Sequence, residues 1–282
     1  MKTTRIIARL DIKGPNLVKG IHLEGLRVLG KPEDFARYYY ENGADELFYQ
    51  DVVASLYDRN SLNDLISRTA KEIFIPLTVG GGIRTVEDIR SILRAGADKV
   101  CINTAAIKNP DLIKEASRVF GSSTIVVAIE AIKQTDGKYL AYTDNGREHS
   151  GLEIIEWAKK VEELGAGEIV ITSVDQEGSG LGFDIELTKN VSNAVSIPVI
   201  AHGGAGNEED VCNVIQEGNA DAVALASILH YNFIEKNVKG ILGKEEGNTE
   251  FLKSGKAFTK IKPNTISNVK KFLIGKSINV RS

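Results

Sequence analysis

Eight short runs rich in valine, isoleucine and leucine alternate with helical patterns along the whole chain, and this alternation restricts the fold more than any other feature. Near-continuous apolar runs are typical of parallel strands that are covered on both faces. The runs span residues 5–11, 46–52, 75–81, 99–103, 124–130, 168–174, 197–204 and 221–227. Eight βα units in 282 residues predict an α/β fold, a (β/α)₈ TIM barrel forming a single domain over 1–282, with a doubly wound open sheet as the alternative.

The two halves of the chain resemble each other, which also favours the barrel. Residues 75–106 and 197–229 both read as strand, glycine cluster, acidic helix start, glycine stop and second strand. Residues 43–51 likewise resemble residues 165–173. We therefore expect two half-barrel repeats of four units each.

Four connections at the expected carboxyl ends of the strands are long, namely 12–31, 131–149, 175–183 and 228–262. The second contains Asp136-Gly137 between short β-like runs, which predicts a small hairpin. Loops of this length are usually functional or disordered, so this edge of the barrel is the place to look for a site.

Composition excludes other classes of function. The formal net charge of −3 gives no indication of nucleic-acid binding or of a polybasic membrane surface. Two cysteines, Cys101 and Cys212, exclude a disulfide framework and disfavour a cysteine-based zinc site. No apolar run approaches the ~20 residues that span a bilayer, and no signal-peptide core is present. We expect a soluble protein of a reducing cytoplasm.

No metal or cofactor is predicted from the sequence. His22, His149 and His230 are scattered without metal-ligand spacing, so we expect them at the surface or in loops. No nucleotide or other cofactor motif is present, so no cofactor is assigned.

Glycine clusters and small polar residues follow strands three, four, seven and eight. Glycine lets backbone N–H groups approach an anion closely, and a following helix N-terminus adds a favourable dipole. Tight turns without a ligand are the plain alternative, but two clusters at symmetric positions favour two phosphate sites and an elongated substrate with a phosphate at each end. The residues concerned are Gly81, Gly82, Asn103, Thr104, Gly203, Gly204, Ala226 and Ser227.

Two acidic residues are expected to face each other across the barrel mouth. Asp11 ends the first run and Glu130 ends the fifth, on opposite sides of an eight-stranded barrel. Two opposed carboxyl groups suit general acid and base catalysis, although each could instead cap its own loop.

Four charged residues begin strands one, two, four and six, at the opposite end of the barrel. If Arg5, Glu46, Lys99 and Glu168 point inward, two cations and two anions close the barrel floor as a ring. Buried charges are costly unless they are paired, so such a ring indicates a gate. Four exposed residues at strand starts are the alternative.

These motifs together resemble the cyclase subunit of imidazole glycerol phosphate synthase and, more distantly, the phosphoribosylformimino isomerase of histidine synthesis. The resemblance runs from Thr4 to about Tyr231 and resumes over 264–281. It is carried by RLDIKGPNLVKG, TVGGGI, GADKVCINTAA, GAGEIVITS and GGAG.

The resemblance implies a lyase-type, glutamine amidotransferase-coupled cyclase that receives ammonia from a glutaminase subunit docked on the barrel floor. Ammonia would pass through the barrel and attack a bis-phosphorylated formimino intermediate, giving imidazole glycerol phosphate. Asp11 and Lys19 then match catalytic residues, the four ring residues match an ammonia gate, and Asp98 matches the glutaminase-facing surface. Thr172 and the glycine segments match substrate-binding positions.

The chain also departs from this family. Glu130 and Glu177 stand where aspartates are usual, and ~1 Å of misplacement can cost ~10²-fold in rate. Arg9 and His202 occupy inward positions that are normally small, and Arg9 could pair with Glu130. An insertion is expected at about 232–262, in the loop after strand eight, as a lid or binding loop.

These departures resemble a paralogous group associated with sugar amidation in surface-polysaccharide synthesis, in which the barrel supplies ammonia to a different acceptor. Three hypotheses about function therefore stay open: a histidine-pathway cyclase, the sugar-amidation paralogue, and a non-catalytic module that activates a glutaminase. The isomerase fits less well, because it needs no ammonia gate.

Overall fold

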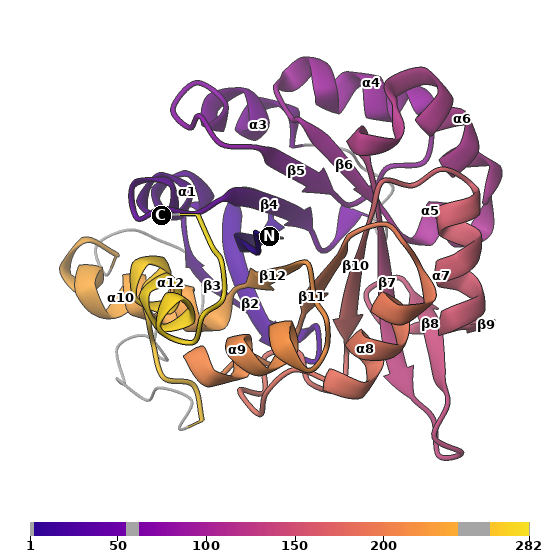
Figure 1. The fold of residues 1–282 in the computed structure, drawn as a ribbon. Coiled ribbons are helices and arrows are strands. Elements are labelled where there is room, and N and C mark those ends of the chain that lie inside the picture. Colours follow the sequence, from indigo (N-terminus) through magenta and orange to yellow (C-terminus); the bar gives the residue numbers. More distant parts are fainter. Residues whose placement is uncertain (1–2, 55–61, 242–259, 282) are drawn as a thin grey trace.

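The computed structural model describes residues 3–54, 62–241 and 260–281, and in it eight parallel strands close into a barrel (Figure 1). The barrel closes because β1 pairs with both β4 and β12, while β10 pairs with both β7 and β11. The barrel strands are β1 (Arg5–Lys13), β4 (Glu46–Asp51), β5 (Leu77–Gly80), β6 (Lys99–Ile102), β7 (Ile125–Lys133), β10 (Glu168–Ser173), β11 (Val199–His202) and β12 (Ala222–Leu225). The predicted (β/α)₈ barrel is confirmed.

Helices surround the strands on the outside of the barrel (Figure 1). They are α1 (Pro32–Glu41), α3 (Asn63–Thr69), α4 (Val86–Ala95), α5 (Thr104–Lys108), α6 (Asp111–Phe120), α7 (Ile154–Glu163), α8 (Ile185–Ala194), α9 (Glu208–Gln216), α10 (Ser227–Ile241) and α12 (Ile266–Gly275), with a 3-10 turn η1 (Ser122–Thr124). Helices α4 and α9 hold equivalent places in the two halves of the chain. Each begins with a capping box, formed by Thr85 with Asp88 and by Asn207 with Asp210.

Apolar side chains form two separate layers because successive residues of a strand point to opposite faces. On β1, Ile6 and Ala8 face outward and belong to the large cluster between strands and helices. Ile7 faces inward and joins a small cluster inside the barrel. That inner cluster also contains Phe48, Cys101, Val126, Ala128, Val170, Ile200, Ala222 and Ala224. The barrel interior is therefore apolar at mid-height.

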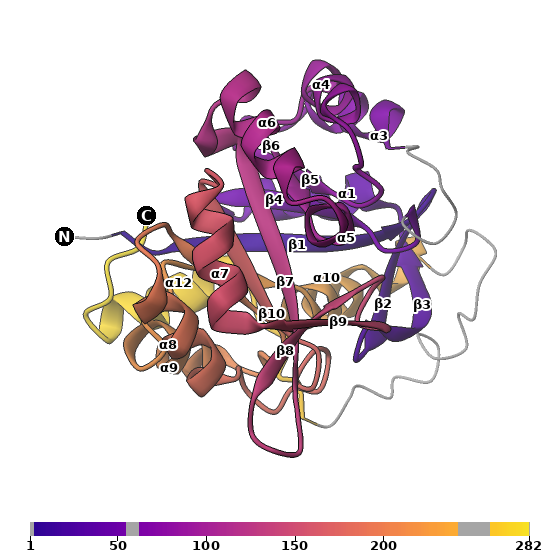
Figure 2. The same ribbon diagram turned by 90° about the vertical axis from the view of Figure 1, so that its right-hand side faces the viewer.

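Two antiparallel hairpins extend the barrel at the carboxyl ends of β1 and β7. Strand β1 continues past Asp11 to pair with β2 (Asn16–Ile21), which pairs with β3 (Glu24–Gly30). Strand β7 continues past Glu130 to pair with β8 (Tyr139–Thr143), which pairs with β9 (Glu148–Glu153). The hairpin predicted at Asp136-Gly137 is present, and residues 12–31, expected as a long connection, form a second hairpin. Figure 2 shows β2 and β3 at the end of the barrel opposite the chain termini.

The chain termini close the other end of the barrel. Thr4 forms a bridge with Val280, and Lys270 of α12 makes a buried ion pair of 2.8 Å with Asp45, just before β4. The other carboxylate oxygen of Asp45 accepts a hydrogen bond from the backbone N–H of Ile6. Helix α12 is thus tied to the first two barrel strands.

The expected connection over 228–262 begins as helix rather than loop, because α10 extends from Ser227 to Ile241. Residues 242–259, which hold most of the expected insertion at about 232–262, lie outside the described residues.

Candidate functional site

The mouth of the barrel contains a buried cluster of charges built on β1 and β2. Strand β1 points Arg9 and Asp11 inward, and Arg9 Nε donates a hydrogen bond to Asp11 Oδ1 at 3.0 Å. Lys19 Nζ lies 3.7 Å from the other Asp11 oxygen. Burial alone would raise the pKa of the Asp11 carboxyl, but Arg9 and Lys19 outweigh it and hold the pKa well below its usual range. Asp11 is therefore ionised at neutral pH.

Glu130 occupies the equivalent place on β7 but has a different environment. Its Oε2 accepts a hydrogen bond of 2.8 Å from the backbone N–H of Gly146, in the turn between β8 and β9. Burial raises the pKa of Glu130 to about 7, and the Gly146 N–H and the charge of Arg9 only partly offset that rise. The expected pairing of Arg9 with Glu130 is wrong: the ion pair of Arg9 is with Asp11, two residues away on the same strand face.

Lys19 also makes an ion pair with Glu177, in the loop after β10, and this contact holds the β2–β3 hairpin over one side of the mouth. Glu177 Oε2 accepts from the backbone N–H of Leu23 at 2.9 Å, and the Glu177 carbonyl accepts from the backbone N–H of His22. Asn145, in the β8–β9 turn, donates to the Leu23 carbonyl at 2.9 Å. The two hairpins thus meet above the barrel.

The two predicted phosphate-binding segments line different cavities. Gly81, Gly82, Asn103 and Thr104 line the larger cavity, of about 160 Å³, together with Arg9 and Glu130. Gly203, Gly204, Ala226 and Ser227 line a cavity of only about 20 Å³, which Lys19 and Glu177 border from the hairpin side. The closed hairpin therefore leaves one half of the mouth open and nearly fills the other.

Glycine is required at both segments for a physical reason. Gly81 has φ +103°, and a Cβ there would lie 2.3 Å from the carbonyl oxygen of Asp51. Gly204 has φ +113°, and a Cβ there would lie 2.0 Å from the carbonyl oxygen of Gly182. Both glycines line the mouth cavities, where the absence of a side chain leaves room for a close approach of a ligand to the backbone.

Thr172 and His202 lie side by side inside the barrel, with 3.2 Å between Thr172 Oγ1 and His202 Nδ1. Burial and the charge of Arg9 lower the pKa of His202 well below its usual range, so this histidine is neutral. The expectation that His230 lies at the surface or in a loop is wrong. It is fully buried in α10, where Nδ1 contacts Tyr39 Oη at 2.6 Å.

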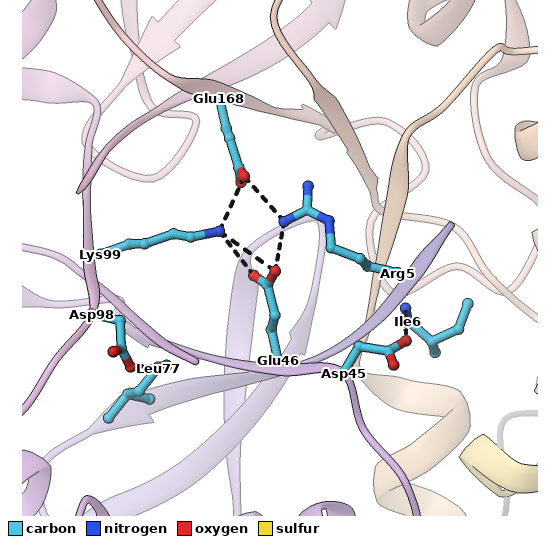
Figure 3. A network of polar contacts seen from close by, with 8 residues as sticks. All are labelled: Arg5, Ile6, Asp45, Glu46, Leu77, Asp98, Lys99 and Glu168. Carbon is cyan, nitrogen blue, oxygen red and sulfur yellow. Dashed lines mark hydrogen bonds and ion pairs between the residues drawn. The ribbon is translucent and has the colours of Figure 1, made fainter. Parts of the chain in front are cut away.

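At the opposite end of the lumen, the structure brings the four predicted ring residues together (Figure 3). Arg5 Nη1 lies 2.6 Å from Glu46 Oε1 and 3.0 Å from Glu168 Oε1. Lys99 Nζ lies 3.3 Å from Glu46 Oε2 and 3.0 Å from the same Glu168 oxygen. Each cation thus bridges both anions, and each side chain is at most 16% exposed, which is the inward arrangement rather than four exposed strand starts.

Asp98 lies beside this ring, immediately before β6 (Figure 3). Its Oδ2 accepts a hydrogen bond of 2.8 Å from the backbone N–H of Leu77. Phe74, a few residues before β5, is 79% exposed at the same end of the barrel and contacts the ring of Tyr40 edge-on. The sequence did not lead us to predict an exposed position for Phe74. A phenylalanine in the connection between a helix and a strand was the signal that could have indicated it.

No group of three or more His, Cys, Asp or Glu side chains in 3–54, 62–241 and 260–281 is arranged to hold a metal ion. Within the same residues, no helix is long and apolar enough to cross a membrane.

Fold and site together define a TIM-barrel protein with duplicated glycine-rich segments and opposed acids at its mouth and a charged ring at its floor. A family model described as "Histidine biosynthesis protein" matches residues 5–235, and the chain belongs to this family.

Curated relatives agree with this assignment. The chain is 59% identical over 210 residues to imidazole glycerol phosphate synthase subunit HisF of Legionella pneumophila, which covers 74% of this chain and 99% of the relative. It is 49% identical over 232 residues to the HisF subunit of Alkaliphilus metalliredigens and 51% identical over 251 residues to that of Methanococcus vannielii. Each of these matches covers 82% of this chain and 92% of the relative. The resemblance to the cyclase subunit is thereby confirmed.

Proposed function

We propose that this protein receives ammonia from a glutaminase subunit at the barrel floor, conducts it through the lumen and adds it to a phosphorylated acceptor at the mouth. The similar HisF proteins are named as subunits of imidazole glycerol phosphate synthase, and this name motivates both the partner and the acceptor. The histidine-pathway reaction, cyclisation of a bis-phosphorylated formimino intermediate, is the acceptor reaction proposed first.

The observation that carries the proposal is the closed ring of four charges beneath an apolar lumen. The ring is electrically neutral, and its cations each contact both carboxylates, so the charges are paired where they are partly buried. Above it, Ile7, Phe48 and Val170 belong to an apolar layer that disfavours water and ions. Ammonia is small and uncharged, so it crosses such a layer at lower cost than ammonium does.

At the mouth, two carboxyl groups with opposite pKa shifts suit the proton transfers of ammonia addition. When ammonia adds to a carbonyl carbon, the nitrogen loses one proton and the oxygen gains one, and the same pair of transfers occurs again when that oxygen leaves as water and the imine forms. Ionised Asp11 accepts the first proton, and Glu130, with a pKa of about 7, is protonated often enough to donate the second. The glycine-lined segments and Lys19 supply contacts for acceptor phosphates.

The test is to mix the purified protein with the glutaminase subunit from the same source and measure glutamine hydrolysis. Hydrolysis should rise on binding, and absence of any rise would count against the conduit. Asp11→Asn should lower product formation from the formimino intermediate by about 10²–10⁴-fold while the far-ultraviolet circular dichroism stays unchanged. Retained turnover would remove Asp11 from the mechanism.

A second candidate, ammonia supply for sugar amidation, is favoured by two observations at the mouth. Arg9 donates a hydrogen bond to Asp11 Oδ1, so this oxygen already has a partner. The Lys19–Glu177 ion pair borders one predicted phosphate site and leaves little space in it. Glu130→Asp should raise turnover of the histidine-pathway intermediate if side-chain length alone limits it. No change in turnover, together with intact glutaminase activation, would favour the sugar acceptor.

A further inference from the structure

The apolar layer inside the barrel is closed toward the mouth as well as toward the floor. Four of its members are at most 1% exposed, namely Ile7, Phe48, Val126 and Val170. A molecule the size of water or ammonia therefore does not reach them from the mouth while the side chains are arranged in this way. Passage of ammonia from the lumen to an acceptor requires that a side chain between this layer and the mouth moves.

Arg9 is a side chain that lies between the apolar layer and the mouth. Its Cζ atom lies 5.2 Å from the centre of the Phe48 ring, which belongs to the layer, and Arg9 also lines the larger mouth cavity. The guanidinium group therefore covers the Phe48 ring on the side of the cavity. Because the Arg9 side chain is only 4% exposed, it is packed into the upper part of the lumen rather than extended into the mouth.

The charge of Arg9 acts on side chains from several sides of the barrel. In the order of the strands, β6 and β7 lie three and four strands from β1 in one direction, and β11 lies two strands from β1 in the other. Besides burial, which is the largest cause, the positive charge of Arg9 affects the pKa of Cys101 on β6, of Glu130 on β7 and of His202 on β11. The guanidinium group from β1 therefore reaches toward the middle of the lumen.

Arg9 is better suited to move than the polar side chains beside it. Thr172 and His202 are shorter and contact each other at 3.2 Å. Arg9 has a long side chain with many rotamers, and its one ion pair is with Asp11, through Nε. Within the part of the chain that the structure describes, no other hydrogen bond holds the guanidinium group.

We propose that Arg9 is a second gate, at the mouth end of the lumen, and that an incoming anionic acceptor opens it by drawing the guanidinium group away from Asp11. The inference rests on the proposed function, because it takes ammonia to travel through the lumen. It adds a positioning residue that makes the delivery of ammonia depend on the presence of the acceptor.

One movement of Arg9 opens the conduit and frees the base. While Arg9 donates to Asp11 Oδ1, the lumen is covered and this carboxylate oxygen has a partner. A guanidinium group pairs with phosphate as well as with carboxylate, so an anionic acceptor in the larger cavity competes with Asp11 for Arg9. When Arg9 turns toward the acceptor, Asp11 becomes available to take a proton from the nitrogen of the adding ammonia. Ammonia then reaches the mouth only when an acceptor is there.

The two cysteines of the chain test whether Arg9 covers the lumen, without glutaminase or acceptor. Cys101 belongs to the apolar layer and lines the larger cavity, whereas Cys212 is buried between the strands and the helices, on α9. Methyl methanethiosulfonate is a small, uncharged reagent. The cysteine thiolate attacks its sulfur, a methyl disulfide forms and methanesulfinate leaves. Mass spectrometry of the peptides gives a separate rate for each cysteine.

In Arg9→Ala, Cys101 should react about tenfold or more faster than in wild type, while the rate of Cys212 stays within about twofold. Burial raises the pKa of Cys101 to about 12, and the charge of Arg9 partly offsets that rise. Removal of the charge by itself therefore slows the reaction, so a faster reaction reports access. Lys108→Met removes another cation from the same cavity lining and should leave both rates unchanged.

Unchanged labelling of Cys101 in folded Arg9→Ala, or equal acceleration of Cys101 and Cys212, would overturn the gate, because equal acceleration indicates a general loosening of the protein. If Arg9→Ala does not fold, Arg9→Ala combined with Asp11→Asn takes its place. Removal of both partners leaves no unpaired charge in the pair. The same acceleration of Cys101 alone is expected in this double variant.

A second measurement tests the coupling to the acceptor. With the glutaminase, glutamine and a limiting amount of the formimino intermediate, wild type should form about one product per glutamate, and Arg9→Ala less than about half of that, because ammonia escapes through an open mouth. An equal ratio in the two proteins would overturn the acceptor-driven opening. Absence of glutaminase activation in wild type would overturn the proposed function, whereas the cysteine rates would still decide whether Arg9 covers the lumen.

Discussion

Lys19 on β2 and Glu177 after β10 form a buried ion pair across 158 positions of sequence. Both side chains are at most 3% exposed, and Glu177 also accepts the Leu23 backbone N–H. The contact therefore connects the hairpin that covers the mouth with the loop on the far side of the barrel. Both residues also line the smaller mouth cavity, which contains one of the two predicted phosphate sites.

Glu177→Gln should loosen the hairpin and destabilise the protein. Removal of one partner from a buried ion pair costs ~3–5 kcal/mol, and the lower value is expected because Lys19 keeps Asp11 at 3.7 Å. Urea denaturation should show a free energy of unfolding lower by about 3 kcal/mol. Amide hydrogen exchange should become faster over residues 16–30.

The matched control is Glu24→Gln, since Glu24 pairs with Arg147 at 3.7 Å in an exposed position. Its effect on stability should stay within about 0.5 kcal/mol. Equal effects of the two substitutions, or unchanged exchange over residues 16–30, would mean that the Glu177 pair does not hold the hairpin.

Glu130 should make stability depend on pH in a direction opposite to that of an ordinary ion-paired carboxylate. Its pKa is raised by burial to about 7 in the folded protein, above the 4.5 of the free side chain. The folded state therefore binds the proton more tightly, and the resulting stability is full below pH 4.5 and is lost as pH rises through 7. At pH 8, above both pKa values, the ionised carboxylate of Glu130 lowers the free energy of unfolding by about 3 kcal/mol.

Glu130→Gln should thus be more stable relative to wild type at pH 8 than at pH 5, by about 2 kcal/mol. Guanidinium denaturation at the two pH values measures this difference. The control is Glu148→Gln, at an exposed position on β9. Its free energy of unfolding should differ from that of wild type by the same amount at both pH values. A pH-independent effect of Glu130→Gln would contradict the raised pKa.

The barrel was predictable because it depends on patterns that repeat locally. Each of the eight apolar runs overlaps a barrel strand, and the inward phase of Arg5 and Asp11 on the first strand followed from alternation alone. The β2–β3 hairpin was not predicted, because its strands are short and polar in part. Its register depends on pairing with a continuation of β1 beyond Asp11.

The contacts at the mouth could not be predicted for a related reason. Whether Arg9 pairs with Asp11 or with Glu130 depends on which carboxylate already has a partner. Glu130 receives the N–H of Gly146 because Asp144 and Asn145 both adopt left-handed backbone conformations in the β8–β9 turn. That geometry is not encoded in the residues of the barrel strands, so the sequence identified the participants but not their pairing.

Phe74 and Asp98 should contribute to binding of the proposed glutaminase subunit, because both are exposed just before barrel strands, and Asp98 lies beside the charged ring (Figure 3). An exposed aromatic side chain is a frequent anchor of an interface. Phe74→Ser should weaken binding by about 1–2 kcal/mol, five- to thirtyfold in Kd by calorimetry. Asp98→Asn keeps an acceptor for the Leu77 N–H and should weaken binding if its charge faces the partner.

Leu181→Ser is the control for this interface, since Leu181 is also exposed but lies in the loop between β10 and α8 at the other end of the barrel. Its effect on the Kd should be less than about twofold. If Phe74→Ser and Leu181→Ser bind the glutaminase equally well, the floor is not the docking face.

The ring should behave as one coupled unit, because Glu168 Oε1 accepts from both Arg5 and Lys99 at 3.0 Å. Glu168→Gln leaves two cations facing the single carboxylate of Glu46, and should lower the free energy of unfolding by about 2 kcal/mol, between the values for exposed and for buried pairs. Glu163→Gln, which removes an exposed pair with Lys160, should change it by less than about 0.5 kcal/mol.

Adding Lys99→Met to Glu168→Gln restores neutrality and leaves the 2.6 Å pair of Arg5 with Glu46 in place. The double variant should therefore be more stable than the sum of the two single effects predicts, by about 1–2 kcal/mol. Urea denaturation of the four proteins completes the cycle. Additivity within about 0.3 kcal/mol would mean that the four charges act independently, and a ring of independent charges has no cooperative opening with which to regulate passage through the floor.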